Sequence, residues 1–168
     1  MRILGIDPGS RHCGWGVIER SGNRFSAVGW GRLSPDVGRP LAERLLEIAA
    51  GLGRIIELHR PHRAVVERVF HGASARSLIV LAEARGAILV ELARHGLAVE
   101  ELAPAEVKSA VAGSGRADKA QVGRMVRLTL ALPAGPLAAD ASDALAVAVA
   151  GAQRGDLARR LAAAAHSA

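Results

Sequence analysis

The sequence predicts an α/β protein with a mixed five-stranded sheet covered by helices on both faces. Three observations predict it: three short apolar strands joined by tight turns, a change to helical spacing after Pro40, and two later strands that each follow a long helix. Strands joined by tight turns pair antiparallel, whereas strands joined by helical crossovers pair in parallel. The order βββαβαβ, followed by further helices, therefore gives a mixed sheet between two helical layers.

Each strand is a short, largely apolar run that ends at turn-forming residues. The predicted strands cover residues 2–6, 14–19, 25–33, 64–67 and 98–102. The helices are predicted from apolar residues that recur at three- and four-residue spacing, with glycine or proline at their ends. They lie between Pro40 and Pro61 and over residues 74–95, 104–112, 119–130 and 140–153.

The length predicts one folded domain, residues 1–153, followed by a short Ala/Arg-rich C-terminal tail, residues 154–168. The chain has no run of about 18 uncharged apolar residues, so a membrane span is not expected. The N-terminus reaches Asp7 too early for a signal peptide. One cysteine, Cys13, excludes an intramolecular disulfide and a cysteine-based zinc cluster. These features favour a cytoplasmic protein with no membrane partner.

The formal net charge is +6. Lys108 and Lys119 are the only lysines, so arginine carries nearly all of the positive charge. An excess of arginine favours a polyanionic partner, either nucleic acid or an acidic membrane surface. Codon bias in a GC-rich genome accounts for the arginine count equally well, so the charge suggests nucleic acid without establishing it.

Two carboxylates occupy unusual places in the predicted sheet. Asp7 ends the first strand, where it either caps the turn at Pro8-Gly9 or serves a site. Glu67 directly follows Ala64-Val65-Val66 inside a strand expected to be buried, and burying an unpaired carboxylate is costly. An arginine partner or a metal ion would account for Glu67.

A second pair of acids, Asp140 and Asp143, lies three residues apart on one face of the last helix. Capping of the helix N-terminus explains Asp140 but not both residues. Four carboxylates on three elements that converge at one sheet edge need a counter-charge, which hard divalent cations supply. Two Mg²⁺ ions about 4 Å apart clamp a phosphodiester for in-line attack by water, and Mn²⁺ also suits carboxylate ligands.

Five motifs follow one another along the chain: Ile6-Asp7-Pro8-Gly9-Ser10 with Gly14-Trp15-Gly16, Val66-Glu67-Arg68-Val69-Phe70, Glu83-Ala84-Arg85-Gly86, Val107-Lys108 with Gly113 through Gln121, and Asp140-Ala141-Ser142-Asp143-Ala144-Leu145-Ala146. In this order and at these spacings, they resemble the motifs of the RuvC family of bacterial Holliday junction resolvases. The resemblance covers residues 2–150. It implies a ribonuclease H-like fold and a Mg²⁺-dependent homodimeric crossover junction endodeoxyribonuclease that works beside RuvA and RuvB in DNA recombination and repair.

The resemblance also implies roles for individual residues. Asp7, Glu67, Asp140 and Asp143 fall on the family's four acidic positions, which hold the metal and catalyse symmetric nicking that leaves 5′-phosphate and 3′-hydroxyl ends. Some relatives carry histidine at the first position of the last pair, whereas this chain keeps Asp140. The expected DNA contacts are Phe70, which would stack on bases, Lys108 and Lys119, together with Arg76 and Arg116, which are suggested by their places in the chain.

Three alternatives compete with this interpretation. A nuclease of the same fold that processes RNA, related to the YqgF group, would share Asp7 and the metal chemistry, but the Phe70 motif and the segment from Lys108 to Gln121 favour the junction enzyme. An actin-like or sugar-kinase-like ATPase shares the Asp7-x-Gly9 pattern, but it needs about twice this length. A basic DNA-binding module without catalysis fits poorly, because clustered carboxylates repel phosphates unless a metal is present.

Overall fold

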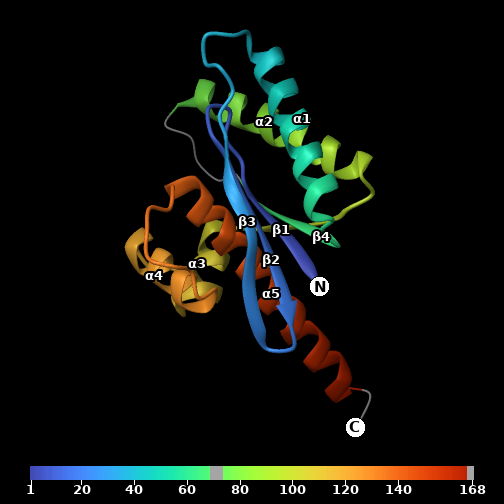
Figure 1. The fold of residues 1–168 in the computed structure, drawn as a ribbon, viewed down its shortest axis with the longest axis vertical. Coiled ribbons are helices and arrows are strands. Elements are labelled where there is room, and N and C mark those ends of the chain that lie inside the picture. The colour runs from blue at the N-terminus through green and yellow to red at the C-terminus, as the bar shows by residue number, and fades with distance from the viewer. Residues whose placement is uncertain (69–73, 166–168) are drawn as a thin grey trace.

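The computed structural model describes residues 1–68 and 74–165. It contains a five-stranded sheet in the order β3-β2-β1-β4-β5 (Figure 1). β1 pairs antiparallel with β2 and parallel with β4, so the predicted mixed sheet is confirmed. The strands are β1 (Arg2–Asp7), β2 (Cys13–Ser21), β3 (Arg24–Leu33), β4 (Arg63–Glu67) and β5 (Ala98–Leu102).

Helices cover both faces of the sheet (Figure 1). On one face lie α1 (Leu41–His59) and α2 (Ala75–Arg94); on the other lie α3 (Pro104–Ala112), α4 (Lys119–Thr129) and α5 (Ala139–Ala165). Four of the five predicted helices begin and end within two residues of these bounds. The last helix is predicted to end near Gln153, with the tail beyond Gly155 either helical or frayed. In the structure the helix continues to Ala165, because the Ala-rich residues that follow are strong helix formers.

Alternation along the strands divides the core into two layers. In β1, Leu4 and Ile6 face α1 and α2, whereas Ile3 faces α5. In β4, Ala64 and Val66 face α1 and α2, and Val65 faces α5. Because side chains alternate with a period of two, the final residues of both strands, Asp7 and Glu67, belong to the α5 face.

Helix α5 approaches the sheet closely because both surfaces carry small residues. A Cβ atom on Gly5 would lie 2.2 Å from the carbonyl oxygen of Ala144 and 2.8 Å from Cβ of Ala148. A Cβ atom on Gly14 would lie 2.0 Å from the carbonyl oxygen of Asp140. These glycines set the distance between the sheet and the helix that carries Asp140.

In the part of the chain that the structure describes, none of the helices is long and apolar enough to cross a membrane.

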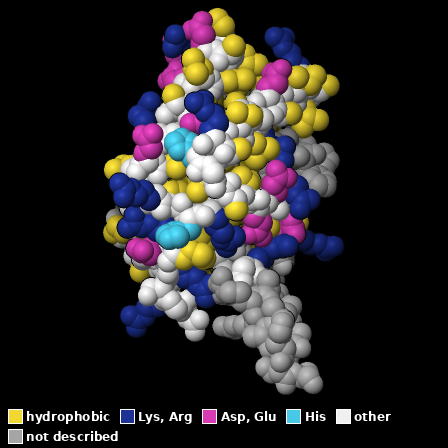
Figure 2. Space-filling model, turned by 90° about the vertical axis from the view of Figure 1, so that its right-hand side faces the viewer, with side chains coloured by type: hydrophobic (Ala, Val, Ile, Leu, Met, Phe, Trp, Pro, Cys, Tyr) yellow, Lys and Arg dark blue, Asp and Glu magenta, His cyan; other side chains and the backbone are white. Residues whose placement is uncertain are grey.

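The outer face of α2 carries hydrophobic side chains that are exposed. Leu78, Ile79 and Val90 expose 39%, 60% and 61% of their surface. Ile79, Ala82, Gly86 and Val90 follow one another at helical spacing, so they lie along one side of the helix. Figure 2 views the molecule from the α1 and α2 side and shows hydrophobic side chains lying between charged ones.

Candidate active site

The parallel pairing of β1 and β4 brings two of the predicted acids together. The register places Ile6 beside Val66, so Asp7 and Glu67 follow side by side at the same edge of the sheet. Both side chains are half-buried and face α5. Glu67 is the last residue of β4 rather than an interior one, so its prediction as a carboxylate inside the strand is corrected to one at the strand end.

The first turns of α5 bring the other two acids to this edge. Asp140 lies in the first turn of the helix, against Gly14, which pairs with Asp7 in the sheet. Asp143 follows three residues later on the same helix face. The sequence therefore folds so that three separate elements deliver four carboxylates to one place.

Mutual repulsion among the carboxylates acts most strongly on Asp7. Burial, together with the negative charges of Glu67, Asp143 and Asp140, raises the pKa of Asp7 to about 7, and Lys119 opposes this shift. The pKa of Glu67 is also raised, first by burial and then by Asp143. The site accumulates more negative charge than the protein itself neutralises.

Two basic side chains partly balance the acids. The Nζ atom of Lys119 donates a hydrogen bond to Oδ2 of Asp143 at 3.0 Å, and this bond is the main reason why the pKa of Lys119 is raised. A guanidinium nitrogen of Arg32 lies 3.6 Å from Oδ2 of Asp140. With these ion pairs formed, no three acidic, histidine or cysteine side chains of the described residues converge closely enough to hold one ion as they stand.

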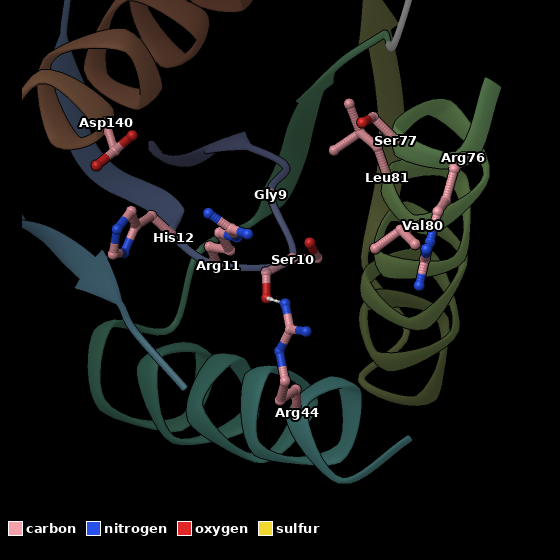
Figure 3. Close-up of a pocket in the computed structure, with 10 residues that line it drawn as sticks. All are labelled: Gly9, Ser10, Arg11, His12, Arg44, Arg76, Ser77, Val80, Leu81 and Asp140. Carbon is pink, nitrogen blue, oxygen red and sulfur yellow. Dashed lines mark hydrogen bonds between the residues drawn. The ribbon is translucent and has the colours of Figure 1, made fainter. Parts of the chain in front are cut away.

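Cavities open on two sides of the acids. The first, of about 220 Å³, is lined by Glu67 and Asp143 together with Lys108 and Lys119. The second, of about 740 Å³, lies between the loop after β1 and the helices α1 and α2, and Asp140 stands at its edge (Figure 3). A polyanion therefore has positively charged approaches from both sides of the carboxylates.

The predicted DNA-binding residues fall into four groups. Lys108 and Lys119 lie beside the acids in the first cavity, and Arg76 lines the second. Arg116 is exposed in the turn between α3 and α4 and lines neither of these cavities, so the structure does not bring it to the acids. Phe70 lies outside the described residues.

Sequence reasoning missed three arginines near the acids. Arg32 comes from β3, Arg11 from the loop after β1 and Arg44 from α1. Each looked like an ordinary surface arginine among twenty. No pattern along the chain marks them, because their places depend on a bulge in β3 and on how a loop and two helices pack together.

The carboxylates fit hard divalent cations. Carboxylate oxygens are the ligands that Mg²⁺ and Mn²⁺ prefer, and four of them from three elements match the donor set of a two-ion site. Burial and the negative charges of the other three acids raise the pKa of Asp7, so its charged form is disfavoured in the protein alone. A divalent cation would supply positive charge to this cluster.

Replacing Asp7 by asparagine is expected to stabilise the metal-free fold. The folded-state pKa of about 7 lies above the ordinary value of 3.8, so ionised Asp7 disfavours folding as the pH rises from 4 to 7 and above. At pH 8 in EDTA, Asp7→Asn should raise the free energy of unfolding by about 1–3 kcal/mol. This gain in the free energy of unfolding should vanish near pH 3, where the carboxyl of Asp7 is protonated in both the folded and the unfolded state. Urea melts at the two pH values measure it, and an unchanged or lower stability at pH 8 would contradict the repulsion.

Comparison with known proteins agrees with this site. Residues 3–151 match the family model for crossover junction endodeoxyribonuclease RuvC. The chain is 48% identical over 149 residues to a protein of that name from Chloroflexus aggregans, covering 89% of this chain and 91% of the relative. It is 45% identical over 161 residues to one from Rhodopseudomonas palustris, covering 96% of this chain and 92% of the relative.

The structural comparison gives the same result. The fold superposes on Thermus thermophilus RuvC in complex with Holliday junction substrate with a TM-score of 0.88 and 31% sequence identity, covering 94% of this chain and 96% of the other. The ribonuclease H-like fold implied by the resemblance is thereby confirmed. Since sequence and fold agree over nearly the whole length, the chain belongs to the RuvC family of crossover junction endodeoxyribonucleases.

Proposed function

We propose that the chain is a divalent-metal-dependent endonuclease that resolves Holliday junctions by nicking two strands symmetrically, in DNA recombination and repair. The observation that carries this function is the convergence of four carboxylates from β1, β4 and α5 at one sheet edge, between two cavities lined by basic residues. Family membership supports junction DNA as the substrate.

Asp7, Glu67, Asp140 and Asp143 would hold the metal, for which we propose Mg²⁺, two ions per site, with Mn²⁺ as a substitute. Bound there, the ions would lower the pKa of the attacking water and stabilise the leaving oxygen. The four carboxylates are held in fixed positions, because β1, β4 and α5 pack into the two core layers. In-line attack on the side opposite the 3′-oxygen would leave 5′-phosphate and 3′-hydroxyl ends.

The two lysines act on the substrate rather than on the metal. Lys119 exposes 80% of its side chain, so it can turn from Asp143 toward a phosphate oxygen. Lys108 lines the same cavity beside Glu67. We propose that both neutralise charge on the scissile phosphate, that Arg76 and Arg116 contact the DNA backbone, and that Phe70 stacks on bases near the junction centre.

The wider context follows from the family resemblance. We propose that RuvA and RuvB are partners, that the protein acts in the cytoplasm, and that residues 1–153 carry the nuclease, with 154–168 as an appended segment. Arg154 lies at this boundary and is tied to the domain by ion pairs with Glu100 and Glu106.

A homodimer would place one active site on each of two symmetric strands of the junction. The exposed hydrophobic face of α2 supports this assembly, because exposed apolar side chains gathered on one helix face are typical of an interface. The dimer surface proposed here consists of Ile79, Ala82, Gly86 and Val90.

A charge on the dimer surface should separate the subunits. Val90→Glu would bury a carboxylate in an apolar interface, which costs several kcal/mol, so we expect a monomer at micromolar concentration and loss of paired nicking. Leu128→Glu is the matched control, because Leu128 is 74% exposed on α4, which covers the opposite face of the sheet. Light scattering after size-exclusion chromatography measures the molar mass of both variants. An unchanged mass for Val90→Glu would exclude this surface.

The proposed function is tested by incubating the protein with a synthetic four-way junction, a linear duplex and an RNA–DNA hybrid, with Mg²⁺ or with EDTA. The expected result is paired nicks confined to the junction and dependent on Mg²⁺. Cleavage of the hybrid or of RNA instead would leave the metal site in place and move the function to RNA processing. Equal activity in EDTA would overturn the metal mechanism.

A further inference from the structure

The larger cavity beside the acids is built around three arginines from three different elements. Arg11 lies on the loop after β1, Arg44 on α1 and Arg76 at the start of α2 (Figure 3). The cavity has a volume of about 740 Å³, and Asp140 lines its edge. Whatever occupies this space therefore lies next to the carboxylate site.

Within the described residues, little negative charge balances the arginines of the cavity. Asp140 is its one acidic lining residue, and Arg32 already pairs with that carboxylate. Among the residues described by the structure, neither Arg11 nor Arg76 has a carboxylate partner. By contrast, Arg63 and Arg85 are paired with Glu100 and Glu101 elsewhere on the sheet.

Arg44 is held in the lining of the cavity by the β1–β2 loop. One of its terminal nitrogens donates a hydrogen bond to the carbonyl oxygen of Ser10, which fixes the guanidinium against that loop (Figure 3). Among the described residues, Arg44 forms no ion pair with a carboxylate. Its guanidinium is therefore positioned beside the space in which an anion would bind.

Part of the cavity wall is apolar. Val80 and Leu81 line it from α2, opposite the β1–β2 loop. A free inorganic anion would leave these side chains against water. A nucleic-acid strand presents phosphates to the arginines and sugar rings to the apolar wall, so it satisfies both parts of the lining.

We propose that this cavity binds the backbone phosphates that neighbour the scissile phosphate on the cleaved strand, with Arg11 and Arg44 as phosphate contacts in addition to Arg76. The inference rests on the proposed function, because it places the scissile phosphate at the carboxylates that include Asp140. On this proposal, the three arginines position the cleaved DNA strand from the α1 and α2 side of the acids. Lys108 and Lys119 position it from the α3 and α4 side.

The test is the salt dependence of junction binding, measured by fluorescence anisotropy in EDTA so that no cleavage occurs. A lost phosphate contact lowers the slope of log affinity against log salt by about 0.9. We expect Arg11→Gln, Arg44→Gln and Arg76→Gln each to lower that slope by about this amount and to weaken binding about five- to tenfold in 100 mM salt. Arg11 and Arg76 are exposed, so their variants keep the test valid if Arg44→Gln folds poorly.

Arg24→Gln and Arg54→Gln are the matched controls, since each removes the same charge. Arg24 is exposed at the β2–β3 turn, about 26 Å along the sheet from Cys13. Arg54 is exposed on the same helix as Arg44, about 15 Å farther along. Both variants should bind with the wild-type slope.

Three outcomes are informative. If the cavity variants have the same slope as the controls, the inference is overturned. If inorganic phosphate raises the melting temperature of the wild type but not of Arg11→Gln or Arg76→Gln, while all slopes stay equal, the cavity takes a free anion and the inference is also overturned. The wild type could instead fail to cut junctions but bind another nucleic acid. If the cavity variants then show the expected loss of slope on that nucleic acid, the cavity assignment holds and the proposed function fails.

Discussion

Asp7→Asn is expected to lower junction cleavage at least 1,000-fold while leaving junction binding within about threefold of the wild type. Asp7 is the acid on which the other three act most strongly, and it lies at the centre of the cluster between β4 and α5. Asparagine keeps the shape but removes the charge that holds a divalent cation. A loss of about 4 kcal/mol in transition-state stabilisation corresponds to this factor.

Single-turnover cleavage of a synthetic junction with excess enzyme and Mg²⁺ measures the effect, and anisotropy in EDTA measures binding. The matched control is Asp36→Asn, because Asp36 is an exposed loop residue that accepts a hydrogen bond from the Gly38 backbone. Wild-type cleavage by Asp7→Asn would refute the site. Because the same variant is expected to be more stable without metal, unfolding cannot explain its inactivity.

Gly5→Ala is expected to have the largest effect on stability. The added Cβ would lie 2.2 Å and 2.5 Å from backbone atoms of Ala144 and Ala148, and backbone cannot move aside as a flexible side chain can. Helix α5 must shift away from β1, which opens the core layer that holds Asp140 and Asp143 in place. We expect a loss of about 3 kcal/mol or more in the free energy of unfolding.

Gly123→Ala is the matched control for this prediction. Gly123 lies inside α4, and a Cβ there would meet only the Ser142 hydroxyl, at the ordinary contact distance of 3.7 Å. Alanine favours a helix over glycine, so this variant should be unchanged or up to about 1 kcal/mol more stable. Thermal and urea melts measure both variants. Equal stability of Gly5→Ala and Gly123→Ala would mean that α5 does not pack on Gly5 as described.

The acidic cluster could be predicted from the sequence because its signals are local. Asp7 and Glu67 each end a short apolar run, and a period of two places them on one face of two parallel strands. Asp140 and Asp143 lie on one helix face by spacing alone. The local signals do not show that α5 packs on that face of the sheet. This packing depends on the glycines at positions 5 and 14, which let the helix approach closely.

Arg32 could not be predicted, because its place depends on an irregular strand register. From the turn, Ser21 pairs with Arg24 and Ile18 with Ala27, but Val17 pairs with Gly29, so one extra residue enters β3. Without this bulge, Gly14 would pair with Gly31, and Arg32 would point to the other face. The sequence carries no clear signal for the bulge.

Arg11 and Arg44 were missed for a different reason. The cavity that they line forms where the β1–β2 loop packs near α1 and α2. No spacing of residues along the chain predicts that packing. Local patterns locate residues on elements, whereas a cavity depends on how those elements pack. The sequence leaves the segment beyond Gly155 as helical or frayed, because an Ala/Arg-rich segment lacks the apolar periodicity by which the other helices are assigned.

We propose that Asp7, Glu67, Asp140 and Asp143 together hold divalent cations. Anomalous X-ray scattering from crystals of the wild type and of Asp7→Asn soaked in Mn²⁺ tests this assignment. We expect Mn²⁺ peaks coordinated by these four carboxylates in the wild type, with at least one peak lost in Asp7→Asn. Peaks that avoid these side chains, or that persist unchanged in Asp7→Asn, would contradict it.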